Sequence, residues 1–256
     1  MEELIAFLLK AYCQIHSEHS NFSFDKGRSQ HYYLVCLYAT ILEISQDCLL
    51  LYENYPIGRH IVSLPILLRS NMEAYVDFIN LIKDENYGDT MKASWLKQNI
   101  KLLKEALNNQ DNPYIKNLRS YGNVEKRLEE FEKEFQSLKN KNINPQFIAN
   151  RFRLAGLTNE YNSIYILLCS YTHNSPFALE KRHFQRSGED YHLVVSKVEN
   201  LEELLPYFDM LCEILVCSSQ LIHNFFGSPI GKDMDKLWEE FMVIRQSYSI
   251  QLNNTN

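Results

Sequence analysis

The segment from about residue 59 to 83, which contains LPILLRSNMEAYVDFINLI, most constrains the fold. Its apolar residues recur at helical spacing and cover almost the whole circumference of the predicted helix. A helix that is hydrophobic all round is stable only when other elements cover it. The chain has only 8 Gly and 7 Pro in 256 residues, so few positions interrupt long helices. We therefore predict an all-α, multi-helix bundle with this segment at its centre and a kink at Pro65 in its first turns.

Further segments repeat this apolar spacing and are separated by short turn-rich stretches. We predict helices over 2–18, 30–53, 87–109, 121–140, 146–155, from 158 to about 173, 200–226 and 231–249. No linker is long enough to separate two domains. The prediction is one helical domain over 1–256, with a core over about 30–226 and the first and last helices packed on it.

Two segments depart from the main pattern. The helix predicted over 121–140 is charged apart from one apolar stripe, so we expect it on the outside of the protein. The stripe consists of Val124, Leu128, Phe131, Phe135 and Leu138. The segment RHFQRSGEDYHLVVS holds two short extended runs around the turn SGED, which predicts a small extended or β-hairpin insertion near 181–196.

Composition narrows the classes of partner and compartment. The formal net charge of −6 provides no overall field that attracts nucleic acid or an anionic membrane. The six cysteines are scattered in apolar segments without a C-x-x-C pair, which is typical of reduced, buried thiols. The start of the chain lacks a basic signal-peptide region, and the apolar runs 61–82 and 204–226 carry acidic residues that would lie in mid-bilayer. We expect a cytoplasmic protein without a membrane span.

Charged residues stand in the middle of the central segment. At about 100° per residue, Arg69, Glu73 and Asn80 fall within about 40° of one stripe, and Asp77 lies somewhat to the side. Arg69 and Glu73 are one turn apart and can pair directly, which leaves guanidinium donors free for a ligand. Two interpretations are open: a buried clasp that holds neighbouring helices in register, and part of a working site.

A second set of candidates lies in EYNSIYILLCSYTHNSP, residues 160–176. Ser170 and His173 share a face near the end of this helix. The helix dipole favours a protonated histidine there, which suits a phosphate contact or a general acid, whereas a histidine that caps the last carbonyls is the simpler alternative. Tyr165 and Asn174 are supporting candidates. Cys169 shares the face, but its apolar surroundings argue against a reactive thiolate.

Taken together, LLRSNMEAYVDF and the downstream FRLAGLTNEYNSIYILLCSYTHNSP resemble an uncharacterised bacterial and phage-associated helical family. Its members have an Arg-Ser-x-x-Glu-Ala helix and a later Tyr, Ser and His helix. The resemblance covers roughly residues 30–225 and implies an all-helical fold. It singles out Arg69, Ser70, Glu73, Ser170 and His173, but it brings no established reaction.

One arginine, one carboxylate and one histidine can run phosphodiester chemistry without a metal. His173 would act as general acid or base, Arg69 would stabilise charge on phosphorus, and Glu73 would orient one of them. In this respect the chain resembles, more distantly, the HEPN (higher-eukaryote-and-prokaryote nucleotide-binding) helical ribonucleases of toxins and antiphage systems. Those carry an arginine followed four to six residues later by a histidine on a helix, a spacing found here at Arg186 and His192, across a turn.

We therefore expect a metal-independent ribonuclease of toxin or antiphage-defence type that acts on RNA. It is expected to form a homodimer, by the HEPN resemblance, or to bind a partner protein. The alternative is a non-enzymatic interaction or small-ligand-binding bundle, in which Arg69, Glu73 and His173 form a structural network. A catalytic trio should be open to solvent beside a basic cleft, whereas a clasp should be sealed. No P-loop, G-x-G-x-x-G, H-E-x-x-H or G-x-S-x-G motif occurs, so we expect no cofactor. His16 and His19 in HSEHS are weak evidence for a metal.

Overall fold

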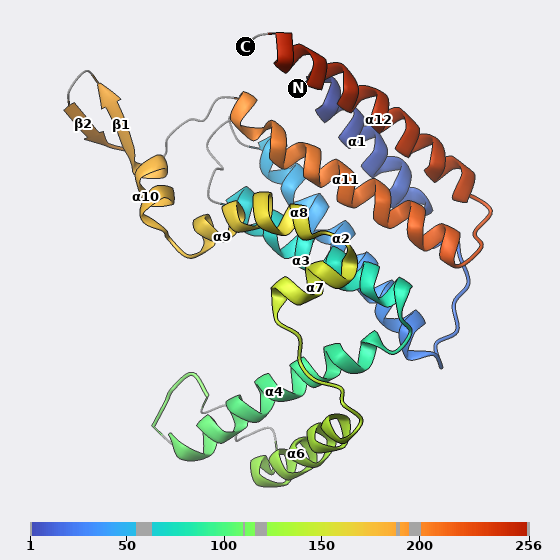
Figure 1. The fold of residues 1–256 in the computed structure, drawn as a ribbon, viewed down its shortest axis with the longest axis vertical. Helices are drawn as coiled ribbons and strands as arrows, with labels where there is room; N and C mark the ends of the chain where they lie inside the picture. Colours follow the sequence, from blue (N-terminus) through green and yellow to red (C-terminus); the bar gives the residue numbers. More distant parts are fainter. Residues whose placement is uncertain are drawn as a thin grey trace.

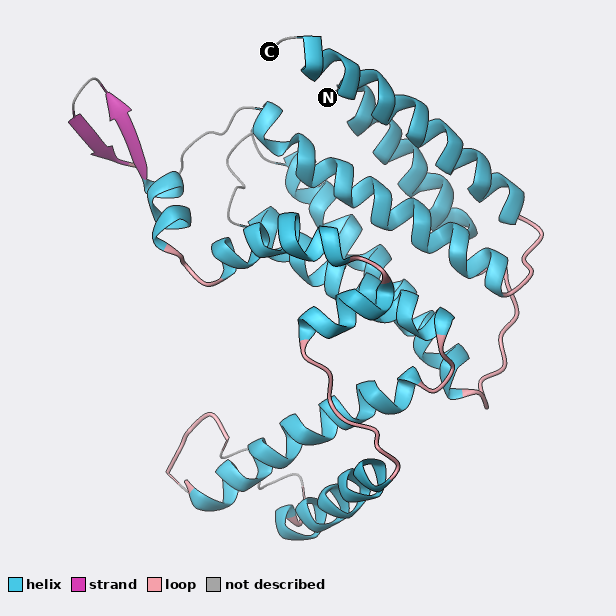
Figure 2. Cartoon of the chain, viewed as in Figure 1, coloured by secondary structure: helices cyan, strands magenta, loops and turns pink. Residues whose placement is uncertain are grey.

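A computed structural model describes residues 2–54, 63–109, 111–115, 122–187, 190–194 and 201–254, and it confirms an all-α bundle with one small hairpin (Figures 1 and 2). The helices are α1 (Glu2–Glu18), α2 (Ser29–Asn54), α3 (Ser63–Lys83), α4 (Tyr87–Asn108), α6 (Val124–Asn140), α7 (Ile148–Ala155), α8 (Thr158–Glu160), the π-helix η1 (Tyr161–Tyr165), α9 (Ile166–Thr172), α10 (Pro176–His183), α11 (Leu201–Phe225) and α12 (Gly231–Asn254). The strands are β1 (Phe184–Ser187) and β2 (Asp190–Leu193).

The apolar segment predicted to be central is α3. It packs against α2 and α11 on one side and against α7 and α9 on another. Leu68, Val76 and Phe78 are completely buried, as the all-round hydrophobic pattern predicts. Pro65 lies in the first turn of the described helix, where a missing backbone N–H costs least. The predicted start, residues 59–62, lies outside the described residues.

The first and last helices, α1 and α12, both pack against α11 and against each other. Phe7 of α1 stacks on Phe241 of α12 at a ring-centroid distance of 5.9 Å, and Lys10 forms an ion pair with Glu240 at 2.7 Å. By length and apolar composition, the spans Ser29–Glu53 and Glu203–Phe225 meet the criteria for membrane helices. This is weak evidence, because core helices of a bundle meet the same criteria and both spans supply core residues.

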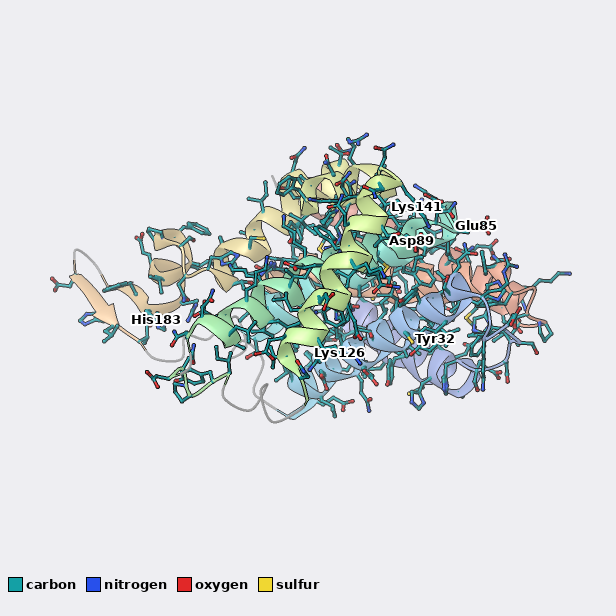
Figure 3. The ribbon with its side chains drawn as sticks, turned by 90° about the horizontal axis from the view of Figure 1, so that it is seen from below. Tyr32, Glu85, Asp89, Lys126, Lys141 and His183 are labelled. Atoms are coloured by element: carbon teal, nitrogen blue, oxygen red, sulfur yellow. The ribbon has the colours of Figure 1, made fainter. Side chains whose placement is uncertain are left out.

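Helices α4 and α6 form a pair that extends away from the main bundle (Figure 1). Figure 3 shows α6 from below, with Lys126 and Lys141 near its two ends. The predicted apolar stripe faces α4: Val124 and Leu138 are buried, and Phe131 contacts Trp95 at a ring-centroid distance of 5.0 Å. The apolar stripe on α6 and the facing side of α4 therefore pack together, separately from the main core.

The predicted hairpin is present as two antiparallel strands in which Ser187 pairs with Asp190. Residues 181–183, placed in the insertion by the sequence pattern, are instead the last turn of α10. A second correction concerns the cysteines, which were all expected to be buried. All six are free, but Cys13 and Cys36 are exposed, because their positions fall on the outer faces of α1 and α2.

His223 of α11 is a polar residue enclosed by the core. It has no exposed surface, and the rings of Phe22 and Tyr38 lie edge-on to it at 5.3 and 6.4 Å. Neither ring nitrogen has a hydrogen-bond partner. Burial lowers the pKa of His223, and the nearby His19 lowers it further.

Acidification below about pH 6.5, the ordinary histidine pKa, is expected to destabilise the fold through His223. Below that pH the unfolded chain binds a proton at His223 that the folded chain excludes. The contribution of neutral His223 to the free energy of unfolding is therefore complete above the ordinary pKa, and it is lost as the pH falls toward the lower pKa of the folded state. The measurement is the free energy of unfolding in urea between about pH 5.5 and 7.5. The free energy of unfolding should depend less steeply on pH in His223→Phe than in the wild type. An equal dependence in the two proteins would show that His223 is not the group responsible.

Candidate functional site

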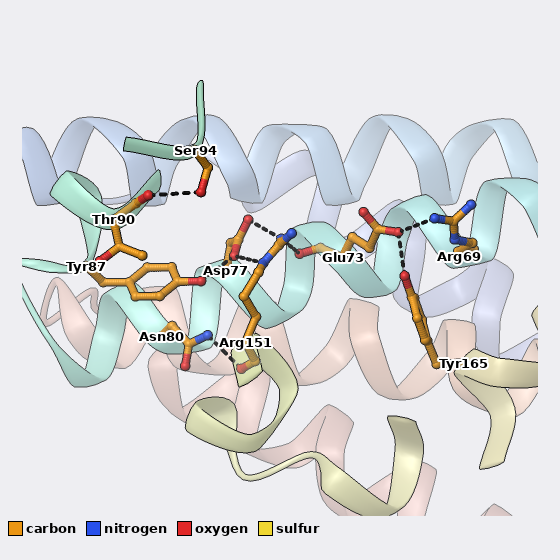
Figure 4. Close-up of polar contacts among 9 residues, drawn as sticks. All are labelled: Arg69, Glu73, Asp77, Asn80, Tyr87, Thr90, Ser94, Arg151 and Tyr165. Atoms are coloured by element: carbon orange, nitrogen blue, oxygen red, sulfur yellow. Dashed lines mark hydrogen bonds and ion pairs between the residues drawn. The ribbon is translucent and has the colours of Figure 1, made fainter. Parts of the chain in front are cut away.

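The charged residues of α3 form a cluster with a tyrosine from η1 (Figure 4). Nη2 of Arg69 lies 3.0 Å from Oε1 of Glu73, and the Tyr165 hydroxyl donates a hydrogen bond to the same oxygen at 2.8 Å. The Arg69 guanidinium also lies over the Tyr165 ring, 5.8 Å from its centroid. We call Arg69, Glu73 and Tyr165 the Glu73 cluster.

The Glu73 cluster is neither sealed nor fully open. The side chains of Arg69 and Glu73 are 24% and 31% exposed, while Nε of Arg69 is buried without a hydrogen-bond partner. Burial raises the pKa of Tyr165 well above its ordinary value, so its hydroxyl stays protonated and remains a donor to Glu73. The carboxylate is therefore held from two sides, and one guanidinium donor is left unsatisfied.

A second cluster lies one turn further along α3. Arg151 of α7 binds Asp77 through two nitrogens: Nε lies 2.8 Å from Oδ1, and Nη2 contacts Oδ2. The Tyr87 hydroxyl donates to Oδ1 of Asp77 at 2.7 Å. Burial raises the pKa of Asp77, whereas Arg151 and Tyr87 lower it, so the pairing offsets the cost of enclosing the charge. We call Asp77, Tyr87 and Arg151 the Asp77 cluster.

Short polar contacts join the two clusters and fasten α7 to α3 (Figure 4). Nη2 of Arg151 donates to the backbone carbonyl of Glu73 at 3.3 Å, and Nδ2 of Asn80 donates to the Arg151 carbonyl at 3.0 Å. One turn later, Nζ of Lys83 donates to the carbonyl of Ala155 at 2.6 Å, near the end of α7. A continuous polar strip thus runs along a helix that is otherwise core.

Sequence reasoning missed the Asp77 cluster. It placed Asp77 beside the main stripe and assigned it no partner. The signal that was available is the one-turn step from Glu73 to Asp77, which puts both carboxylates on one side of α3. No local sequence pattern predicts Arg151 as the partner of Asp77, because the two residues are 74 positions apart.

A pocket of about 210 Å³ opens beside the Asp77 cluster. It lies between α3, α4 and the start of α7. Its lining residues are Asp77, Tyr87, Thr90, Met91, Ser94, Trp95, Gln98, Gln146 and Arg151. We call it the α3–α4 pocket. A second hollow of about 360 Å³ shares Met91 and Trp95 with it and adds Tyr33 and Lys92.

The structure does not bring His173 to Arg69 or Glu73. His173 is exposed and follows the last residue of α9, where its backbone N–H donates to the carbonyl of Cys169 at 3.0 Å. It lies eight residues beyond Tyr165, which is about 12 Å along a helix. Within the described part of the chain, no contact links its ring to the Glu73 cluster.

Of the supporting candidates, Tyr165 belongs to the Glu73 cluster, whereas Ser70, Ser170 and Asn174 make only local contacts. The hydroxyls of Ser70 and Ser170 donate to the backbone carbonyls of Ile66 and Leu167 on their own helices. Asn174 has a positive φ of 51° after the helix, and its side chain accepts a hydrogen bond from Arg182 at 3.1 Å. These contacts are local, and none of them reaches the polar strip on α3.

The sequence near His173 is rich in basic residues, but these do not gather at one site. Arg151 is bound to Asp77, Lys181 pairs with Glu203 at 3.2 Å, and Arg182 contacts Asn174. Arg186 and His192 stand on β1 and β2, so their spacing lacks a helical context. Over the described ranges, no group of three or more His, Cys, Asp or Glu side chains is placed to hold a metal ion.

Comparison with known families matches residues 31–192 to a family described as "Family of unknown function (DUF5677)". The match covers more than half of the chain and includes both clusters, so the chain belongs to this family. No curated protein and no solved structure matches the chain. The family itself carries no assigned reaction, which leaves the geometry to indicate the function.

Breaking the Asp77 cluster is expected to destabilise the protein. Arg151→Met removes the cation and leaves the Asp77 carboxylate, only 15% exposed, without its partner. We expect a loss of roughly 2–4 kcal/mol in the free energy of unfolding, somewhat below the cost for a fully buried pair. The matched control is Arg28→Met, which removes the cation of the exposed pair Arg28–Glu85 and should cost under about 1 kcal/mol. Equal losses in urea denaturation would show that the cluster is not a structural clasp.

Proposed function

We propose that this member of the family of unknown function is a small-ligand-binding helical bundle whose ligand lies in the α3–α4 pocket. The pocket carries the proposal, because hydroxyls, amides and an ion pair line the same hollow as Met91 and Trp95. Sites for small molecules typically combine apolar lining with a few placed polar groups, and in helical proteins they form between helices.

In this proposal the polar strip on α3 is the frame of the site. The Glu73 carboxylate is held by Arg69 and Tyr165, and Arg151 spans from Asp77 to the Glu73 carbonyl. Groups that satisfy one another in this way fix helix positions and have few donors left for chemistry. The absence of a contact between His173 and this strip, among the residues described, favours support over catalysis.

Filling the α3–α4 pocket should abolish ligand binding without unfolding the protein. Ser94 lines the pocket, and its hydroxyl donates to the Thr90 carbonyl at 3.1 Å. The measurement is a thermal-melt screen of a library of metabolite-sized compounds. A compound that binds, at about 100 times its dissociation constant, should raise the melting temperature of the wild type by about 5–10 °C. The same ligand should leave Ser94→Leu unchanged.

The matched control is Ser163→Leu, since Ser163 is exposed and donates to the carbonyl of Asn159 in the same manner but lines neither hollow. This variant should respond like the wild type. Compounds that shift wild type and Ser94→Leu equally would show that the pocket is not the binding site.

A metal-independent ribonuclease of toxin or antiphage-defence type is the second candidate, and one observation favours it. Arg69 and Glu73 on α3 are partly open to solvent, and His173 is exposed at the end of α9, on the helical segment that also carries Tyr165. An RNA strand can span the separation between them, whereas a small substrate cannot. The HEPN resemblance implies RNA as the partner, a homodimeric state and a phage-related context. The six free cysteines agree with a reducing, cytoplasmic compartment.

For this second candidate, the expected result is cleavage of total RNA by purified wild type in the presence of EDTA and none by His173→Ala. Because His173 is exposed, the variant should keep its stability within about 0.5 kcal/mol, and a thermal melt checks this. Intact RNA with the wild type, or equal cleavage by a folded His173→Ala, would remove this candidate.

A further inference from the structure

The α3–α4 pocket has a distinctive charge balance. Its two ionic residues are paired with each other, with two nitrogens of Arg151 on the two oxygens of Asp77. The Tyr87 hydroxyl takes a further lone pair of the carboxylate. An anionic ligand would be repelled by the carboxylate beside the guanidinium, and a cationic ligand by the guanidinium beside the carboxylate, so the pair gives neither charge a net attraction. The pocket is therefore suited to a ligand without a formal charge.

One wall of the pocket is a row of polar groups on α4. Thr90, Ser94 and Gln98 follow at steps of four residues and so lie along one face of the helix. Among the described residues, the Gln98 amide has no hydrogen-bond partner, so its donor and acceptor are both free. Gln146, just before α7, also lines the pocket, and its amide already has local hydrogen bonds with Asn144 and Asn150. An amide offers a donor beside an acceptor, and it pairs best with a ligand edge that offers the same.

An apolar strip of the same helix, α4, lies beside this polar row. Trp95 is 49% exposed although it lines the pocket, and Phe131 of α6 supports its ring. Met91, one turn earlier, adds a polarisable thioether. An exposed indole is a stacking platform for a planar ring. The volume of about 210 Å³ is below the range of drug-sized sites, which limits the enclosed part of the ligand to one ring system.

We propose that the α3–α4 pocket binds an uncharged planar heterocycle with an amide-like hydrogen-bonding edge, the chemistry of a nucleobase, stacked on Trp95 and read by Gln98. The proposal rests on the proposed ligand-binding function and names its ligand class. The neighbouring hollow beside Tyr33 gives space for a substituent such as a sugar.

The first test uses the two tryptophans of the chain. In a Trp238→Phe background, Trp95 is the remaining tryptophan, and its fluorescence reports directly on stacking. Adenosine, guanosine, cytidine and uridine are the probes, with inorganic phosphate and the 5′-monophosphates as charged comparators. We expect at least one nucleoside to quench Trp95 in a saturable manner, and we expect its 5′-phosphate not to tighten binding. Titration calorimetry of the wild type provides a second readout that does not depend on the background substitution.

Two variants on one helix test the assigned edge. Gln98→Ala should weaken nucleoside binding roughly 3- to 10-fold, the loss expected for one or two uncharged hydrogen bonds. Lys97→Ala is the control, because Lys97 is the exposed neighbour of Gln98 and lines neither hollow. No saturable signal with any nucleoside, equal effects of the two variants, or binding of phosphate alone would overturn the ligand class.

Failure of this inference is distinguishable from failure of the proposed function. If a library compound stabilises the wild type and not Ser94→Leu while all nucleosides fail, the pocket binds a ligand of another class. If neither the library nor the nucleosides give a response that depends on Ser94, both are wrong.

Discussion

Charge inside an apolar interface must be paired, and that requirement organises this protein around α3. The helix is buried on nearly all sides, yet it carries two carboxylates facing the segment that returns after α6. Arg151 of α7 binds the Asp77 carboxylate, and Tyr165 of η1 donates a hydrogen bond to the Glu73 carboxylate. The positions of α7, η1 and α9 against the bundle thus follow from where the charges on α3 find partners, in addition to the apolar contacts of these segments.

The same pairing shapes the surface beside it. Because Arg151 is held by Asp77 and by the Glu73 carbonyl, α7 stays close to α3 and leaves a hollow toward α4. On the α4 side of this hollow, Phe131 of α6 covers the Trp95 ring only in part, and Trp95 remains half exposed. In the proposed function, structural support and ligand recognition are therefore neighbouring roles on one polar strip, with the frame toward Arg69 and the ligand toward Tyr87.

Much of this could be predicted from the sequence, and the reasons for success and failure are physical. The helices follow from apolar spacing, and the Arg69–Glu73 pair follows from a one-turn step on a single helix. Contacts between distant segments produce no periodic pattern in the sequence, so the partner of Asp77 could not be predicted. The expectation that His173 meets Arg69 and Glu73 depended on the same kind of long-range packing, and its catalytic role stays a prediction. Trp95 was not singled out, since one aromatic on an amphipathic helix looks like ordinary core.

The π-helical turn at Tyr161–Tyr165 gives this region an unusual sensitivity to chain length. A turn closed by longer hydrogen bonds holds about one additional residue, and each residue of a regular helix advances about 100° around the axis. Loss of one residue in η1 would therefore leave a regular α-helical turn and nearly the same orientation of α9. Gain of one residue would instead rotate α9 about its own axis and turn the buried Leu168 outward. The number of residues in η1 therefore sets the orientation of the helix that follows it, and related chains should lose one residue here more readily than they gain one.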